Sequence, residues 1–377
     1  MPIFKRNILT WLAFFFTING CVERIYFNIP GSQLEFTVEG MISDNPGPYS
    51  VKVTKGFSIE ADTSVRVPIS NLTIKLFDDV GNSDNYNEES PGLYISSGAM
   101  KGQVGRSYHI TIQTKEGKVF ESIPDLLTPT GEIDTIRQEF EARTVVKPFG
   151  EFRADVFNIF IDANTTSNDD IEKYSRWRFT GTYKVITYPE KNITSIPGYS
   201  PFLDPYPCSG YEITEGPEGS GGTLEKKGEC TCCICWARDY EVAPQLSDVQ
   251  FISSNKFKNI KIGEVRITPA TFHEKYFIEV EQMSLSRKSF EFFKLVREQK
   301  LNATSLFQPP SGEIIGNIRA KNSSDVAIGI FWASSVRKKS KFLYREDVPY
   351  PLTPIEFNTK PCYTTYKNST TIKPIFW

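Results

Sequence analysis

Residues 34–40 read LEFTVEG and residues 49–54 read YSVKVT, and in both stretches apolar side chains alternate with polar ones. A period of two residues is typical of a β-strand with one buried face. Similar runs, separated by turn-forming clusters of Asp, Asn, Pro and Gly, occur at residues 72–77, 92–95, 108–113 and 119–123. We expect residues 33–128 to form an immunoglobulin-like β-sandwich of about seven short strands, which ends at a proline-bounded junction over 124–131.

The rest of the chain, residues 129–377, predicts a larger β-rich domain with one helix. Its strand-like runs are residues 156–161, 174–185, 260–263, 276–281, 326–333 and 341–344. The helix is expected to begin after Ser286, which can cap its first turn, and to end at Leu301-Asn302. Phe290, Phe293 and Val296 would line the helix face that packs on a sheet. Residues 189–235 form a long irregular loop rich in Pro, Gly and Cys, and loops of this length are often functional.

Composition describes a globular protein and excludes several classes of function. The 377 residues are 39% hydrophobic, 13% aromatic and 23% charged, which excludes a disordered or polytopic membrane chain. Lys and Arg total 43 against 45 Asp and Glu, so no global positive field attracts nucleic acid. Only two histidines are present, His109 and His273, which disfavours His-based metal sites and Ser-His-Asp chemistry.

The first 20 residues predict a lipoprotein signal peptide. Lys5 and Arg6 precede an apolar stretch over residues 8–18, which is too short to cross a bilayer comfortably. Ile18-Asn19-Gly20-Cys21 then resembles a relaxed bacterial lipobox, in which Cys21 would carry acyl chains such as palmitate. An ordinary signal peptide with a chance cysteine is the alternative. With lipidation, residues 21–32 become a tether, and the rest lies in an oxidising compartment outside the cytoplasm.

Six cysteines remain after Cys21, and four of them crowd into the run CTCCIC. Thiolates at C-x-x-C spacing can bind zinc or an iron–sulfur cluster, but an even number in an oxidising compartment favours disulfides. Cys232 and Cys233 are adjacent and a bridge between them would be strained, so bridges running outward to Cys208 and Cys362 are more natural. Connectivity stays open among the candidates Cys208, Cys230, Cys232, Cys233, Cys235 and Cys362.

No sequence motif indicates catalysis, and no cofactor is implied. G-x-S-x-G, P-loop, dinucleotide-binding and H-E-x-x-H patterns do not occur, and two S-x-x-K spacings lack their companion motifs. Aromatic residues concentrate instead in the irregular loop, at Tyr199, Phe202, Tyr206 and Tyr211. They either face a ligand or partner, or fold inward to anchor their own loop.

The chain resembles the Domain of Unknown Function 4249 family of Bacteroidetes outer-membrane lipoproteins, nearly from end to end. The resemblance is carried by Cys21, residues 36–40, residues 47–53, Cys235-Trp236, residues 276–280, residues 284–286 and the run SLFQPPSGEIIGNI at 305–318. It implies an outer-membrane location, lipid anchoring, and genes that often neighbour TonB-dependent receptors. It supplies no catalytic residues.

These observations predict a non-enzymatic outer-membrane lipoprotein that acts as an accessory or ligand-binding partner of a TonB-dependent β-barrel transporter. The sequence does not decide which ligand the protein binds or which membrane leaflet holds its lipid anchor. A surface adhesin or structural module without a transporter partner is the alternative. A thiol or metal enzyme centred on Cys230 to Cys235 is a third hypothesis, which full pairing of the six cysteines would oppose.

Overall fold

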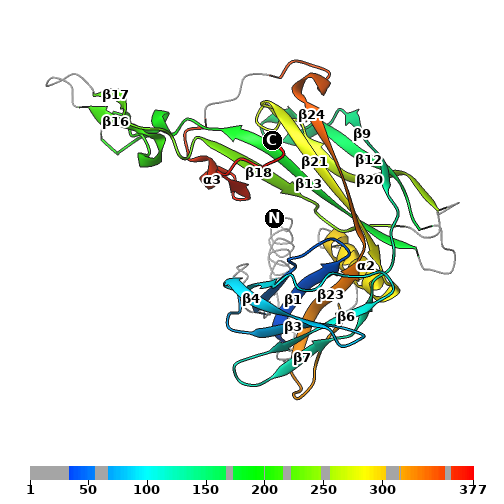
Figure 1. The fold of residues 1–377 in the computed structure, drawn as a ribbon. Coiled ribbons are helices and arrows are strands. Elements are labelled where there is room, and N and C mark those ends of the chain that lie inside the picture. The colour runs from blue at the N-terminus through cyan, green and yellow to red at the C-terminus, as the bar shows by residue number, and fades with distance from the viewer. Residues whose placement is uncertain are drawn as a thin grey trace, which may run out of the picture. The chain divides into compact units, whose positions relative to one another are not determined.

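The computed structural model describes residues 34–55, 67–166, 173–198, 200–214, 222–247, 255–302, 314, 316–352 and 358–377. Strands form most of the regular structure, which confirms the predicted mainly β architecture (Figure 1). The signal segment, the tether with Cys21, Tyr199 and most of the run 305–318 lie outside the described residues.

The first eight strands and two late ones form one ten-stranded sheet (Figure 1). Its order is β22-β7-β6-β3-β4-β5-β2-β1-β23, with β8 beside β6. The strands are β1 (Leu34–Ser43), β2 (Ser50–Lys55), β3 (Thr73–Asp78), β4 (Ser83–Ser90), β5 (Leu93–Ser96), β6 (Ser107–Gln113), β7 (Val119–Ser122), β8 (Asp125–Leu126), β22 (Ile318–Ala320) and β23 (Val326–Ser334). Alternate residues of these strands are buried in one core, as their two-residue period predicts.

The late strands make this sheet differ from the sandwich expected within residues 33–128. β1 pairs with β23 in parallel, and the two backbones approach so closely at Gly329 that an added Cβ would lie 1.9 Å from the Val38 carbonyl oxygen. The outermost strands β22 and β23 also come together, through Asn317, the residue just before β22. Phe331 N of β23 donates to Asn317 Oδ1 at 3.0 Å, and Asn317 N donates to Gly329 O at 3.1 Å. Hydrophobic alternation reports which face a strand buries, not which distant strand lies beside it.

Two further sheets pack on a second core that contains Phe157, Trp177 and Ile278. One has the order β20-β12-β9, and the other has the order β24-β21-β13-β18-β25 with β19 beside β13. Their strands are β9 (Ile133–Glu141), β12 (Val156–Asn164), β13 (Tyr174–Ile186), β18 (Ile234–Tyr240), β19 (Gln245–Leu246), β20 (Lys256–Arg266), β21 (Lys275–Leu285), β24 (Val336–Tyr344) and β25 (Ser369–Thr370).

The long helix α2 (Arg287–Asn302) begins and ends where the sequence predicts. Ser289 N donates to Ser286 Oγ at 3.2 Å, which caps the first turn. Buried Asp125 accepts hydrogen bonds from Ser289 Oγ and from Ala333 N, each at 3.0 Å, and so ties the helix to β23. The ring of Phe293 packs edge-on against Trp332 in a third, smaller core, so the helix does cover sheet residues as expected.

Short elements complete the described chain. Three isolated hairpins pair β10 (Thr144–Lys147) with β11 (Gly150–Arg153), β14 (Ile193–Thr194) with β15 (Phe202–Leu203), and β16 (Tyr211–Thr214) with β17 (Thr223–Lys226). The short helices are η1 (Pro189–Lys191), η2 (Pro207–Ser209), η4 (Arg345–Asp347) and α3 (Cys362–Thr365).

Candidate functional site

The irregular stretch between β13 and β18 forms a disulfide-stapled arm, which we define as residues 189–233. It carries the hairpins β14–β15 and β16–β17 and extends beyond the adjoining ends of β13 and β18 (Figure 1). Two disulfides, Cys208–Cys232 and Cys230–Cys233, hold the arm at its base, with Cα atoms 5.7 Å apart in each. Such cross-links give a shape to a segment that has little core of its own.

The third disulfide, Cys235–Cys362, joins β18 to α3 inside the second core. Both of its cysteines are fully buried. All six cysteines that the sequence proposes for pairing are therefore in disulfides, and four of them form the two outward bridges that end at Cys208 and Cys362. The C-x-x-C pair Cys230–Cys233 is the bridge that sequence reasoning did not single out.

The aromatic residues singled out in the arm differ in their exposure. Phe202 lies on β15 and is 46% exposed. Tyr206 and Tyr211 are half-buried on either side of Cys208, and Tyr199 is outside the described residues. The outward-facing interpretation fits Phe202, and the loop-anchoring one fits Tyr206 and Tyr211.

Aliphatic side chains supply the rest of the exposed apolar surface on the arm. Ile193 is 61% exposed and lies opposite Leu203, also exposed, in the β14–β15 pair. Phe202 precedes Leu203 in β15, so its side chain points to the opposite face of this strand pair. Single exposed apolar residues are ordinary, but exposed apolar side chains on both faces of one short strand pair favour a protein contact. Sequence reasoning missed Ile193 because two-residue strands are too short to show a period.

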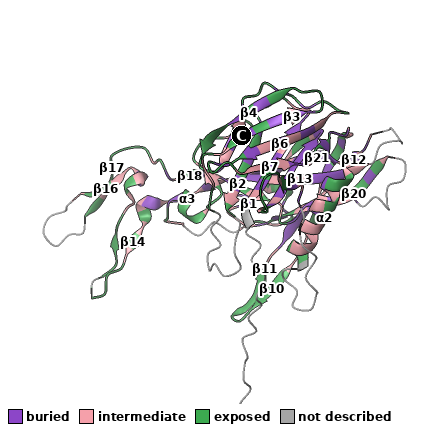
Figure 2. Cartoon of the chain, turned by 90° about the horizontal axis from the view of Figure 1, so that it is seen from below, coloured by how far each residue is buried: buried purple, intermediate pink, exposed green. Residues whose placement is uncertain are grey.

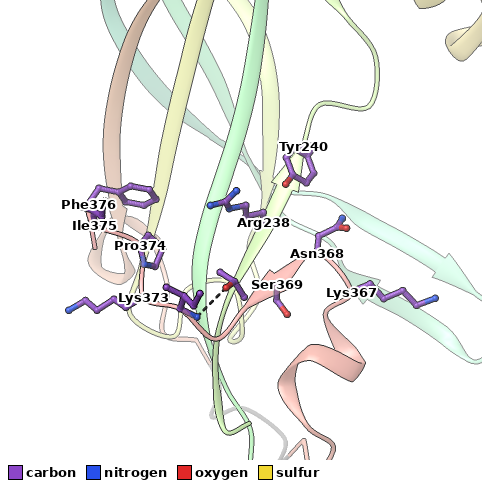
Figure 3. A pocket seen from close by; sticks show the side chains of 11 residues that line it. Arg238, Tyr240, Lys367, Asn368, Ser369, Lys373, Pro374, Ile375 and Phe376 are labelled. Carbon is purple, nitrogen blue, oxygen red and sulfur yellow. Dashed lines mark hydrogen bonds between the residues drawn. The ribbon is translucent and has the colours of Figure 1, made fainter. Parts of the chain in front are cut away.

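A second feature is the C-terminal hollow, an open depression of about 710 Å³ between β18 and the end of the chain (Figure 3). β25 pairs with β18 at Trp236 and Ala237, and the chain then turns as Ile372 N donates to Thr370 Oγ1 at 3.1 Å. The hollow is lined by Arg238, Tyr240, residues 367–370 and residues 372–376. The sequence offers no sign of it, because its walls come from segments far apart in the chain.

Stacked rings fix the outer wall of this hollow. Phe376 stacks on Phe277 of β21 with ring centroids 3.9 Å apart. Lys275 Nζ lies 4.3 Å from the ring centroid of Phe342 and 4.9 Å from that of Trp377. These contacts hold the last residues across β21 and β24.

A hydrogen-bonded pair of titratable groups, half-buried Asp239 and fully buried Tyr276, lies on the opposite face of β18. Tyr276 Oη donates to Asp239 Oδ2 at 2.9 Å, and burial raises the pKa of both groups, that of Tyr276 well above its usual range. Alternate side chains of a strand point to opposite faces, so Asp239 points away from Arg238 and the hollow. The pair therefore contributes to the core and does not face a ligand in this depression.

The hairpin β10–β11 is a third exposed feature, and every residue in its two strands is exposed (Figure 2). Phe149 at its tip is 95% exposed. Arg143 anchors its base, where one guanidinium contacts Glu141 Oε1 at 2.6 Å and Glu264 Oε2 at 2.8 Å. These hydrogen bonds from Arg143 lower the pKa of both glutamates to about 2.

Replacing Arg143 with alanine is expected to return both pKa values toward the ordinary glutamate value of about 4.3. In the intact protein the lowered pKa values favour folding above pH 4.3, and this contribution is lost as the pH falls toward 2. Carboxyl-carbon NMR titration of Glu141 and Glu264 measures the change. Arg137→Ala, which removes the nearby pair with Glu139, is the control and should leave both values low. Unchanged pKa values in Arg143→Ala would contradict the assignment.

In the part of the chain that the structure describes, no group of three or more His, Cys, Asp or Glu residues is placed to hold a metal ion. The described residues also contain no helix long and apolar enough to cross a membrane.

No curated protein matches the chain. The sequence pattern of the family described as "Domain of unknown function (DUF4249)" matches residues 23–340, which include the arm, α2 and the ten-stranded sheet. Because this match covers most of the sequence, the chain belongs to the DUF4249 family.

Proposed function

We propose that this protein is a non-enzymatic lipoprotein of the outer membrane, anchored through Cys21, that assists a TonB-dependent β-barrel receptor in binding or handing over a nutrient. The observation that carries the proposal is the pairing of all six downstream cysteines in three disulfides. Disulfides persist in oxidising compartments outside the cytoplasm. This environment is the one to which a lipoprotein signal peptide before Cys21 would deliver the chain.

The disulfide-stapled arm supports a role in protein contact. Its exposed residues Ile193, Phe202 and Leu203 sit on the β14–β15 pair, which directly precedes the segment 208–233 that two disulfides cross-link. A contact surface held in place before binding loses less conformational entropy when a partner docks. We therefore assign the arm to the receptor contact, with Phe202 as its aromatic anchor.

Isolation of the protein from native outer membranes tests this proposal. Antibodies raised against the purified chain would recover it after mild cross-linking, and mass spectrometry would identify its companions. We expect a β-barrel receptor with the wild-type protein and at least fivefold less receptor with Phe202→Asp, because the new charge must be desolvated in the contact. The N-terminal peptide in the same preparation should begin at Cys21 and carry acyl chains.

Val80→Asp is the matched control, since Val80 is 65% exposed in the turn between β3 and β4, in a different sheet. It should leave receptor recovery unchanged. Failure to recover any β-barrel protein across growth conditions would refute the transporter role and favour the adhesin or structural alternative. A mature N-terminus at another residue would refute the lipid anchor.

A further inference from the structure

The hairpin β10–β11 carries an apolar tip that projects from the body of the molecule (Figure 2). Its turn is Pro148-Phe149, since Lys147 pairs with Gly150, and the Phe149 side chain is 95% exposed. Val146, just before this turn, is 75% exposed. Large apolar side chains gathered at the end of a projecting hairpin indicate contact with another apolar surface.

The base of the hairpin is fixed, so the tip is held out from the sheet. Ala154 N donates to Arg143 O at 2.7 Å, and Arg143 N donates to Asp155 Oδ1 at 2.9 Å. Arg153 pairs with Asp155, and its guanidinium carbon lies 3.7 Å from the ring centroid of Tyr350. Both arginines are therefore engaged within the protein, and the tip is the part of the hairpin that can contact a partner.

Apolar side chains occur on both faces of the hairpin. Val145 and Phe152 are paired and exposed on one face, and Val146 lies on the other because successive residues of a strand alternate. A groove on a folded partner would cover one of these faces. A lipid layer surrounds an inserted hairpin on every side, so this distribution favours a membrane over a protein as the partner.

Two opposite charges lie next to the tip. Lys147 is on the face of Val145 and Phe152, with its Nζ 5.2 Å from the Phe152 ring centroid, whereas Glu151 shares the opposite face with Val146. Among the described residues, no salt bridge joins either charge to another side chain. A zwitterionic phospholipid headgroup offers a phosphate to the lysine and an ammonium group to the glutamate.

We propose that the β10–β11 hairpin inserts into the surface of a phospholipid bilayer, with Phe149 at the edge of the acyl chains and with Lys147 and Glu151 among the headgroups. Its four-residue strands span about 14 Å, and a headgroup layer is about 5–8 Å thick. The tip can therefore cross this layer while Arg143 and Arg153 stay in water. The inference rests on the proposed function for the presence of a membrane, and adds to the lipid anchor a second attachment that would orient the protein.

Phosphatidylethanolamine–phosphatidylcholine vesicles that contain a maleimide lipid test the insertion. The mature chain, residues 21–377, is coupled to them through Cys21, because the other six cysteines are paired in disulfides. This coupling holds the chain at the bilayer whether or not Cys21 is acylated in the cell, so failure of the lipid-anchor proposal does not affect the result.

Phe149→Trp supplies a fluorescent reporter at the tip, after subtraction of the wild-type signal. Phospholipids brominated on their acyl chains quench a tryptophan that enters the bilayer, and we expect them to lower the added fluorescence at least twofold. Val80→Trp is the matched control, because Val80 is also exposed in a turn, between β3 and β4. Its added fluorescence should not change with brominated lipid. Equal quenching in the two variants would overturn the proposal.

Flotation of the uncoupled chain, with Cys21 capped by N-ethylmaleimide, measures the affinity of the hairpin itself. We expect the wild type to float with the vesicles and Phe149→Asp to reduce the bound fraction at least fivefold, because the apolar contact is lost. Phe202→Asp, in the arm, should bind as the wild type does. Salt between 50 and 500 mM should change binding less than twofold, because Lys147 and Glu151 together carry no net charge.

Vesicle binding that survives Phe149→Asp, or that disappears at high salt, would overturn the proposal. Loss of receptor recovery in Phe149→Asp with unchanged vesicle binding would also overturn it, and would identify the hairpin as a protein contact. These outcomes are separable from failure of the transporter role, because receptor recovery is assigned to Phe202 in the arm and vesicle binding to Phe149 in the hairpin.

Discussion

Replacing Cys235 and Cys362 together with alanine is expected to lower the free energy of unfolding by about 4–5 kcal/mol. The two cysteines lie 127 residues apart, and in the chain-entropy description a cross-link closing roughly a hundred residues removes about that much freedom from the unfolded chain. Alanine is chosen because both side chains are fully buried, where serine hydroxyls would lack partners. Urea unfolding followed by tryptophan fluorescence measures the loss.

The double variant Cys230→Ala with Cys233→Ala is the control for this experiment. It also removes one disulfide, but its cysteines are only three residues apart and lie at the base of the arm. The same description gives about 2 kcal/mol for so short a loop. If the two double variants lost equal stability, the cross-link between β18 and α3 would not be what holds the C-terminal segment to the second core.

Replacing Gln282 with leucine is expected to lower the free energy of unfolding by about 3–5 kcal/mol, although the change adds apolar volume to a core. Gln282 is fully buried on β21, and its Oε1 accepts a hydrogen bond from Trp177 Nε1 at 2.8 Å. Its Nε2 donates to Asn164 O at 2.8 Å and to Gly131 O at 3.0 Å. Leucine leaves a buried indole N–H and two carbonyls without their partner.

Gln245→Leu is the matched control for Gln282→Leu. Gln245 is half-buried on β19, and among the described residues its Nε2 donates to the nearby Ala243 O, at 3.3 Å. We expect a loss of less than about 1 kcal/mol. Urea unfolding of both variants decides the matter. A small loss in Gln282→Leu, comparable to that of the control, would show that the junction of β21 with Gly131 and Asn164 does not depend on this side chain.

Local sequence patterns predicted the strands and the helix well, because burial of one face produces a regular spacing of apolar residues along a strand or helix. Val51 and Val53 of β2 are buried with exposed Lys52 between them, as their alternation indicates. In α2, Ser286 caps the first turn and Phe293 faces the sheet, because capping and the helical period are properties of neighbouring residues.

The pairing of segments that lie far apart in the sequence produces no such local pattern. The parallel pairing of β1 with β23 depends on contacts between Val38 and Gly329, and no local pattern encodes which late strand completes an early sheet. The C-terminal hollow is similar, since Arg238 comes to lie beside residues 367–376 only where the chain returns to β18. The bridge from Cys235 to Cys362 follows the same rule, because spacing alone does not select among several partners.

The pairing of β1 with β23 also sets an order of events during biosynthesis. β1 is among the first strands to leave the ribosome, yet its parallel neighbour is complete only when Ser334 has been made. In the interval β1 offers an open edge on which another nascent chain could add a strand. Because one of the last strands covers this edge, the edge of β1 stays open to aggregation until nearly the whole chain has been translated.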